Sequence, residues 1–211
     1  MAHPDILFDG PEDAPLTVAL AHGAGAPMDT PYMAAFAEGL ADRGYRAARF
    51  EFPYMAKRRV GGPKRPPERA PVLLETWRTV VEALGHERLI IGGKSLGGRM
   101  ASMFAATAEA SDAPVRGIVC LGYPFHAPGR AQAPRIDHLK FLRTPALILQ
   151  GTRDPFGGAA EVATYGLSPA IQVHWLEDGD HGLKPRKASG RTERQNWDEA
   201  LDAIAAFLGR L

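Results

Sequence analysis

Three things are scarce in this sequence: cysteine, net charge and long apolar runs. Its 211 residues include one cysteine, Cys120, so no internal disulfide can form and we expect a reducing compartment. The formal net charge is +1, which gives no bulk electrostatic reason to bind nucleic acid or a membrane surface. No apolar run approaches the ~18 residues of a membrane-spanning helix, and the start does not resemble a secretory signal. We therefore expect a soluble, cytoplasmic protein without nucleic-acid or membrane partners.

What is present is the composition of an ordinary globular domain, with 45% hydrophobic and 23% charged residues. A chain of this length can bury a sizeable core, so we expect a single domain over residues 1–211. Apolar runs of strand length alternate with stretches of helical spacing, which predicts an α/β fold with a mostly parallel sheet and helices on both faces. The expected strands are 16–21, 45–52, 88–91, 115–121, 145–150 and 171–176; the expected helices lie at 31–43, 72–84, 96–109, 161–165 and 192–208, and 53–71 is expected to be a long loop.

The most informative stretch is the glycine-rich turn between the strand at 88–91 and the helix at 96–109. Residues 93–97 read Gly-Lys-Ser-Leu-Gly, the G-x-S-x-G spacing of a nucleophile elbow, in which a serine occupies a strained strand-to-helix turn. The flanking positions need glycine because such a turn crowds the backbone, while the serine hydroxyl stays exposed. Ser95 is therefore the candidate nucleophile.

Two other interpretations of this turn compete. A serine that only caps the following helix would give the same pattern. A phosphate-binding loop would also end in Gly-Lys-Ser, as residues 93–95 do, but it requires glycine where this chain has Arg88. We set the nucleotide-binding interpretation aside and look for partners of Ser95 to decide between a nucleophile and a cap.

A serine hydroxyl needs a base to act as a nucleophile at neutral pH, and the base needs an acid to fix its tautomer. Asp154 and His181 each follow a predicted strand, so a parallel sheet brings them to the same carboxyl edge as Ser95. The order serine, aspartate, histidine along the chain is that of α/β-hydrolases. Asp178 and Asp180 are alternative acids. We prefer Asp154, because Asp180 adjoins the histidine and is expected to shape its turn.

The oxyanion that forms when a serine attacks an acyl group needs two N–H donors. One should be the backbone amide of Leu96, the residue after the candidate nucleophile. The other should come from the loop after the strand at 16–21, with Ala24 as first choice and Gly25 as second. His22 in this loop is a candidate substrate contact, although we favour a bracing role for it.

Four segments of the chain together resemble a known family. They are GGKSLGGR at 92–99, LGYPFH at 121–126, QGTRDPFG at 150–157 and GDH at 179–181. They look like the predicted α/β-hydrolases akin to testis-expressed protein 30, which are similar to dienelactone hydrolases. The resemblance covers nearly the whole chain.

This resemblance implies an α/β-hydrolase fold without a large cap domain and a triad of Ser95, Asp154 and His181. It implies no known substrate. Dienelactone hydrolases carry cysteine where this chain has Ser95, which argues against their lactone substrate. A related domain also occurs in a scaffold subunit of a chromatin complex, so membership of the family does not by itself imply catalysis.

The positive charge of this chain is local. Residues 57–69 hold six basic residues against one acid, and residues 184–194 hold five against one. Both segments leave the expected carboxyl edge of the sheet. Solvated loop charge is the simple interpretation. The sharper hypothesis is that Arg58, Arg59 and Arg65 bind a carboxylate or phosphate on the substrate, because guanidinium groups pair with such anions in bidentate geometry.

Tyr123 and His126 follow the strand at 115–121 and are candidates for contacting substrate, although His126 could equally cap its loop. No cluster of His, Cys and carboxylate residues has the spacing of a zinc site, so we expect neither metal nor cofactor.

These features predict a cofactor-free serine hydrolase that acts on esters or thioesters of small acyl groups. Its partner would be a small-molecule acyl substrate, anionic if the arginines contact it. A catalytically weak binding or scaffold module with the same fold is the alternative, and a lyase or perhydrolase with the same triad stays open because fold and triad do not determine the reaction. A monomer and a small homo-oligomer are both compatible with the sequence.

Overall fold

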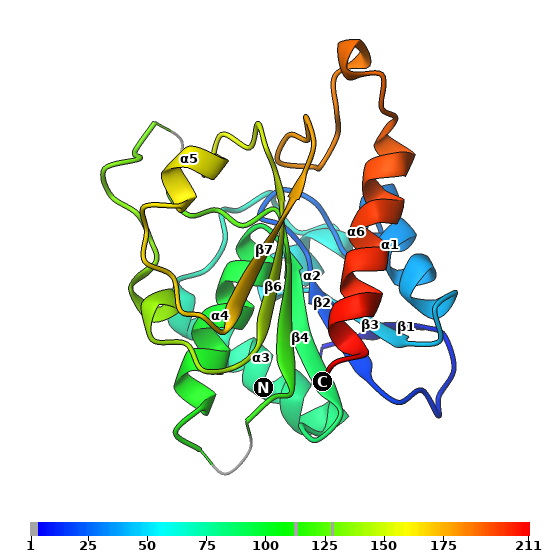
Figure 1. Cartoon of the computed structure of the whole chain (residues 1–211). Helices are drawn as coiled ribbons and strands as arrows, with labels where there is room; N and C mark the ends of the chain where they lie inside the picture. Colours follow the sequence, from blue (N-terminus) through cyan, green and yellow to red (C-terminus); the bar gives the residue numbers. More distant parts are fainter. Residues whose placement is uncertain (1–3, 112–113, 128) are drawn as a thin grey trace.

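The computed structural model describes residues 4–111, 114–127 and 129–211. Seven strands form one sheet in the order β1-β3-β2-β4-β5-β6-β7 (Figure 1). Every neighbouring pair is parallel except β1 and β3, so the expected mostly parallel sheet is confirmed. The strands are β1 (Ile6–Asp9), β2 (Thr17–Ala21), β3 (Arg46–Phe50), β4 (Leu89–Lys94), β5 (Gly117–Leu121), β6 (Ala146–Gly151) and β7 (Ile171–Leu176).

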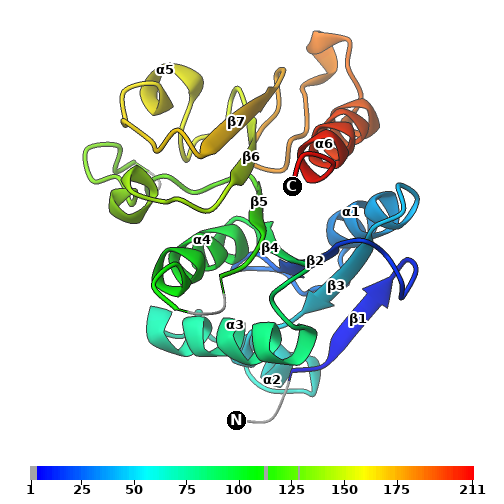
Figure 2. The same ribbon diagram turned by 60° about the horizontal axis from the view of Figure 1, so that its bottom comes forward.

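Helices cover both faces of this sheet (Figure 2). Helices α1 (Pro31–Ala41) and α6 (Glu193–Leu208) pack together on one face, and α3 (Ala70–Leu84) and α4 (Leu96–Ala108) pack on the other. Shorter helices are α2 (Pro53–Arg59), α5 (Ala159–Val162) and two 3₁₀ turns, η1 (Asp137–Lys140) and η2 (Lys187–Ser189). None of the described helices combines the length and apolar character needed to cross a bilayer.

The core has two layers, one on each side of the sheet. On β2, Val18 and Leu20 pack in the layer under α1 and α6, whereas Ala19 and Ala21 face α3 and α4. Successive side chains of a strand point to opposite faces, so a strand buried on both faces must be apolar throughout. This explains the continuous apolar runs in the sequence.

Two helix starts follow directly from capping residues. Thr30 precedes α1, its Oγ1 accepts a hydrogen bond from the Met33 N–H, and Pro31 fills the first helical position. At α6, Thr192 and Gln195 form both hydrogen bonds of a capping box. Both predicted starts are confirmed.

The expectation of a continuous loop over 53–71 is wrong in its first part, because α2 occupies Pro53–Arg59. Pro53 stands at the first helical turn, where its missing N–H costs nothing, and Tyr54 and Met55 are buried and anchor the helix. Residues 60–69 are irregular, and α3 begins at Ala70. The expected helix at 161–165 is the four-residue α5, which begins two residues earlier.

The carboxyl ends of the parallel strands share one edge of the sheet. The loops after β2, β4, β6 and β7 carry His22, Ser95, Asp154 and His181, respectively. In the described part of the chain no large cap domain lies over this edge, as expected.

Candidate active site

Ser95 occupies a strained turn between β4 and α4. Its backbone has φ 51° and ψ −112°, outside the regions that residues with a side chain usually adopt. Cβ atoms at Gly93 or Gly97 would overlap backbone atoms of Ala21 on the neighbouring strand β2, and Gly93 has φ 140°. The G-x-S-x-G spacing is therefore required by how closely β2 runs past the turn.

Ser95, His181 and Asp154 form a chain of hydrogen bonds. The Ser95 hydroxyl donates to His181 Nε2 over 2.8 Å, and His181 Nδ1–H donates to Asp154 Oδ2 over 2.8 Å. The Asp154 carboxylate is buried, whereas His181 and Ser95 are partly exposed. The structure thus brings together the three residues that the sequence singled out, in an arrangement that can move a proton from the serine hydroxyl to the imidazole.

Gln150 and the Phe156 backbone hold the Asp154 carboxylate. The Gln150 side chain is fully buried, and its Nε2 donates to Asp154 Oδ2 over 3.0 Å and to the carbonyl oxygens of Tyr123 and Gly157. The Phe156 N–H donates to Asp154 Oδ1 over 2.9 Å. Sequence reasoning did not assign this role to Gln150; its signal is a buried amide at the end of β6, four residues before the aspartate.

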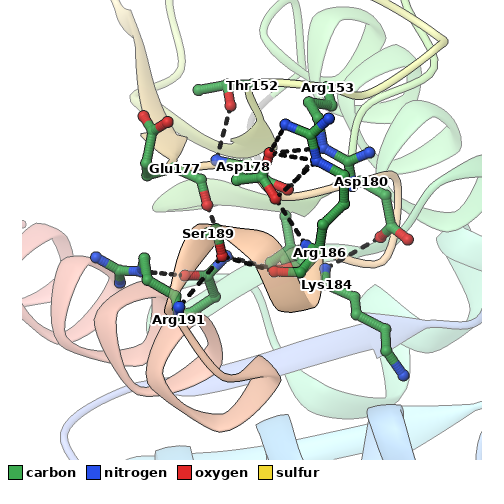
Figure 3. Close-up of polar contacts among 11 residues, drawn as sticks. Thr152, Arg153, Glu177, Asp178, Asp180, Lys184, Arg186, Ser189 and Arg191 are labelled. Atoms are coloured by element: carbon green, nitrogen blue, oxygen red, sulfur yellow. Dashed lines mark hydrogen bonds and ion pairs between the residues drawn. The ribbon is translucent and has the colours of Figure 1, made fainter.

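The two alternative acids have other partners (Figure 3). Asp178 accepts hydrogen bonds from the backbone and guanidinium of Arg186 and pairs with Arg153 at 3.0 Å. These contacts, with the hydrogen bonds from Arg186 first, lower the pKa of the Asp178 carboxyl. Asp180 Oδ1 accepts from the N–H groups of Gly182 and Lys184, so it shapes the turn around the histidine, as expected.

Helix α6 supports the loop that carries His181. Asn196, which is fully buried, donates from Nδ2 to the carbonyl oxygens of Leu183 (2.8 Å) and Glu177 (3.1 Å). Trp197 Nε1 donates to the Gly182 carbonyl oxygen over 3.3 Å. The histidine is therefore placed by contacts on both sides of its loop.

The backbone amides expected to form the oxyanion hole lie beside Ser95. Leu96 is the first residue of α4, where an N–H has no acceptor within the helix. Ala24 and Gly25 lie in the turn after β2 and line the cavity next to Ser95. Within the ranges that the structure describes, none of these three N–H groups donates to a protein acceptor. These N–H groups are therefore available to bind a ligand oxygen.

His22 braces this turn. Its Nδ1–H donates to the Gly23 carbonyl oxygen (2.6 Å), and its Nε2 accepts from the Phe52 N–H (3.1 Å). Burial lowers the pKa of the imidazole, which suits a neutral ring with one donor and one acceptor. The ring is fully buried and does not line the cavity, so the bracing interpretation holds and direct substrate contact does not.

A cavity of about 440 Å³ opens beside Ser95. This volume lies within the range of small-molecule sites. The Phe156 ring, which sequence reasoning did not assign to the site, lies 4.3 Å from the His181 ring between centroids. Most of the lining is small or apolar: Gly23, Ala24, Gly25, Ala26, Pro27, Thr30, Tyr32, Met33, Lys94, Ser95, Phe156 and His181.

Tyr123 and His126, expected to contact substrate, lie away from this cavity. The Tyr123 side chain is fully buried in the core, with its hydroxyl 3.0 Å from Ser102 Oγ. His126 is buried, donates from Nδ1 to the Ala127 carbonyl oxygen (2.8 Å) and lies 3.2 Å from the Glu161 carboxylate. Both side chains turn inward after the strand end, which corrects the expectation.

The three arginines do not line the Ser95 cavity itself. Arg59 donates to Glu51 at 3.0 and 2.7 Å and to Asp29 at 2.8 Å, so carboxylates of the protein already compensate its charge. Arg58 lines a neighbouring hollow of about 320 Å³, and Arg65 lines another of about 630 Å³. No sequence spacing indicated these partners, because Asp29 reaches Arg59 only through the fold.

The described residues contain no group of three or more His, Cys, Asp or Glu side chains that could hold a metal ion. The polar groups that converge at Ser95 are instead a hydroxyl, an imidazole and a carboxylate, which suit proton transfer and acyl transfer.

Comparison with known proteins gives the family. A model of the alpha/beta hydrolase domain matches residues 14–209. Similar solved structures include XC6422 from Xanthomonas campestris, described as an α/β serine hydrolase without a lid, at 18% identity and a TM-score of 0.69 over 98% of this chain and 88% of that one. A second is Est1E from Butyrivibrio proteoclasticus with ferulic acid bound, at 17% identity and a TM-score of 0.68 over 95% of both chains. A serine hydrolase homologue from Coxiella burnetii matches at 17% identity and a TM-score of 0.65 over 97% of this chain and 89% of that one. With the fold and the family model in agreement, this chain belongs to the alpha/beta hydrolase domain family.

Proposed function

We propose that the protein is a serine hydrolase that cleaves esters or thioesters of small acyl groups with Ser95 as nucleophile, His181 as base and Asp154 as the acid that orients the base. The observation that carries this proposal is the pair of 2.8 Å hydrogen bonds that joins the three side chains at the mouth of a cavity. A serine that served only as a helix cap would need no histidine. Ser95 makes no side-chain capping bond to α4.

In the proposed reaction, His181 Nε2 takes the Ser95 proton as Oγ attacks the acyl carbon. The negative charge that develops on the acyl oxygen accepts hydrogen bonds from the N–H groups of Leu96 and Ala24, with Gly25 as the second candidate. His181 then gives the proton to the leaving oxygen or sulfur, which leaves an acyl-enzyme. A water molecule activated by His181 releases the acid, while Asp154 stabilises the imidazolium in both halves.

The cavity beside Ser95 supports a small acyl group as the substrate. Its lining has small side chains on the Gly23–Ala26 turn and aromatic or aliphatic ones at Tyr32, Met33 and Phe156. Such walls suit a short aliphatic or compact aromatic acyl group. The similar structures described as a serine hydrolase without a lid, as the esterase domain of a Rhodothermus marinus protein and as Est1E with ferulic acid bound are consistent with this class of substrate.

Steady-state hydrolysis of matched 4-nitrophenyl esters and thioesters, from acetyl to hexanoyl, tests the proposal. Ser95→Ala is expected to abolish turnover of every substrate that the wild type cleaves. Ser102→Ala is the matched control, because Ser102 Oγ also lies 2.9 Å from a histidine nitrogen, on His138, but does not line the cavity. Retained turnover in Ser95→Ala would contradict the proposal. A folded wild type that cleaves none of them would favour the binding-module alternative.

A further inference from the structure

Lys94 directly precedes Ser95, and its side chain reaches the loop that carries His181. The Lys94 ammonium donates to the backbone carbonyl oxygen of His181. It also lies 5.4 Å from the centroid of the Tyr32 ring, within the range of a cation–π contact. The proposed reaction gives this group no part.

Gly122 leaves the space in which these groups meet. It follows β5 with φ 67°, and a Cβ there would lie 2.5 Å from the His181 carbonyl oxygen and 2.7 Å from Lys94 Nζ. The ends of β4 and β5 and the loop after β7 therefore converge on the ammonium. A residue with a side chain at position 122 would separate them.

The base is consequently held from two sides. Its imidazole is bound by Asp154 through Nδ1, and its own backbone carbonyl is bound by Lys94 from the elbow. Since Lys94 and Ser95 are adjacent on a strained turn, the ammonium connects the nucleophile and the base by a path separate from the 2.8 Å hydrogen bond between them.

We propose that Lys94 is a positioning residue, whose ammonium ties the His181 backbone to the nucleophile elbow and so keeps the imidazole within hydrogen-bonding distance of Ser95. The proposal rests on the proposed function, because positioning affects rate only if the histidine is the base. It adds a residue that neither the G-x-S-x-G spacing nor the serine, histidine and aspartate set identifies.

The electrostatic surroundings of Lys94 make this link sensitive to pH. Burial lowers the pKa of the amine to about 8, although the carboxylates of Asp154 and Asp180 act in the opposite direction. The ammonium also contacts the Tyr32 ring and the His181 carbonyl oxygen, and the His181 imidazole lies beside the same Gly122 position. As pH rises through about 8 the ammonium loses its charge, and its hydrogen bond to the carbonyl loses the charge-assisted part of its strength.

Kinetics of three variants test the proposal. Lys94→Met is expected to lower kcat by at least ~10-fold while KM changes little, since displacing a reacting group by about 1 Å can cost 10²-fold. In the wild type, kcat is expected to fall as pH rises through about 8. Lys94→Arg is expected to have a higher kcat than Lys94→Met and no such fall, because its guanidinium stays charged. Lys184→Met is the matched control, because Lys184 is an exposed lysine on the loop that carries His181 and pairs with the partly exposed Glu193. It should behave as wild type.

A second readout needs no turnover. In proteins that also carry Ser95→Ala, the NMR resonance of the His181 Nδ1 proton reports its hydrogen bond to Asp154. This resonance should shift or broaden when Lys94→Met is added and stay unchanged with Lys184→Met. An unchanged kcat in Lys94→Met, or an unchanged resonance, would overturn the role of Lys94. A wild type without hydrolysis would instead overturn the proposed function, while the resonance would still test the positioning.

Discussion

The hydrogen-bonded centre at Ser95, His181 and Asp154 and the basic segment 57–69 both lie beyond strand ends, yet they are built in opposite ways. At the centre, buried groups hold each partner: Gln150 holds the carboxylate and α6 holds the histidine loop. In the basic segment, Arg58 and Arg65 are exposed, and Arg59 is bound to carboxylates of the protein. At Ser95, Asp154 and His181, buried contacts fix the direction of the side chains that the sequence singled out, whereas in the basic segment the partners of a long charged side chain cannot be derived from the sequence.

The largest expected effect is at the centre. Asp154→Asn should lower kcat by about 10³–10⁴-fold, because an amide cannot hold the tautomer whose Nε2 accepts the serine proton. Asp178→Asn is the matched control. It removes a carboxylate at the same edge of the sheet, one that pairs with Arg186 and Arg153 and not with His181. Its kcat should stay close to that of wild type. Equal losses of kcat in the two variants would contradict a special role for Asp154 in orienting His181.

The next effect is on the turn itself. Gly93→Ala should destabilise the fold by about 3 kcal/mol or more, because the added Cβ overlaps the Ala21 backbone and φ is 140°. Gly158→Ala is the control, since nothing lies within 4 Å of a Cβ there. Urea unfolding measures both. A Gly93→Ala protein as stable as wild type would contradict the close approach of β2 that we describe.

Lys94 offers a pH-dependent comparison. Its pKa is about 8 in the folded protein against 10.5 for an unperturbed lysine. The buried charge therefore lowers the free energy of unfolding by its full amount below pH 8, and this destabilisation disappears between pH 8 and 10.5. The stability of wild type relative to Lys94→Met should therefore improve by up to ~3 kcal/mol over that interval. Urea unfolding of both proteins at pH 7.5 and 10 measures this. Parallel stability curves would contradict a buried amine.

The smallest effects are expected in the basic segment. Arg59→Gln should cost about 1–3 kcal/mol of stability, because it leaves the buried Glu51 carboxylate without its ion pair. Arg58→Gln should change stability by less than about 0.5 kcal/mol, since Arg58 is exposed and makes no ion pair with any described residue.

The same two arginine variants can also be compared by their kinetics. Neither arginine variant should change the ratio of kcat/KM between an anionic ester and a neutral ester of the same size. A selective loss for the anionic ester in Arg58→Gln would show that the basic segment reaches the substrate and would support the hypothesis of an anionic substrate.

Much of the fold could be predicted because the spacing of apolar residues and the residues that form turns and helix caps are local features of the sequence. Buried strands are continuous apolar runs, Thr30 and Thr192 mark helix starts, and loops after parallel strands share an edge. Helix α2 was missed because the prolines and basic residues of 53–71 suggested a loop, whereas the burial of Tyr54 and Met55 stabilises the helix. Burial of that kind depends on the rest of the fold.

The same distinction applies to the site. Ser95, Asp154 and His181 could be predicted because each follows a strand in a tight turn. The direction of Tyr123 and His126 could not, since their burial depends on partners far along the chain, Ser102 and Glu161. Gln150 lies only four residues before Asp154, but its burial against that carboxylate depends on the fold. Lys94 contacts the backbone carbonyl of His181, 87 residues further along the chain, and no residue-type pattern indicates such a contact.

The most direct test of the central claim is labelling of the purified protein with a fluorophosphonate probe, followed by intact-mass and peptide mass spectrometry. We expect one adduct, on Ser95, that is absent in Ser95→Ala, forms much more slowly in His181→Ala, and is unaffected by Ser102→Ala. A folded wild type that takes no label, or an adduct that persists in Ser95→Ala, would contradict an activated serine at this site.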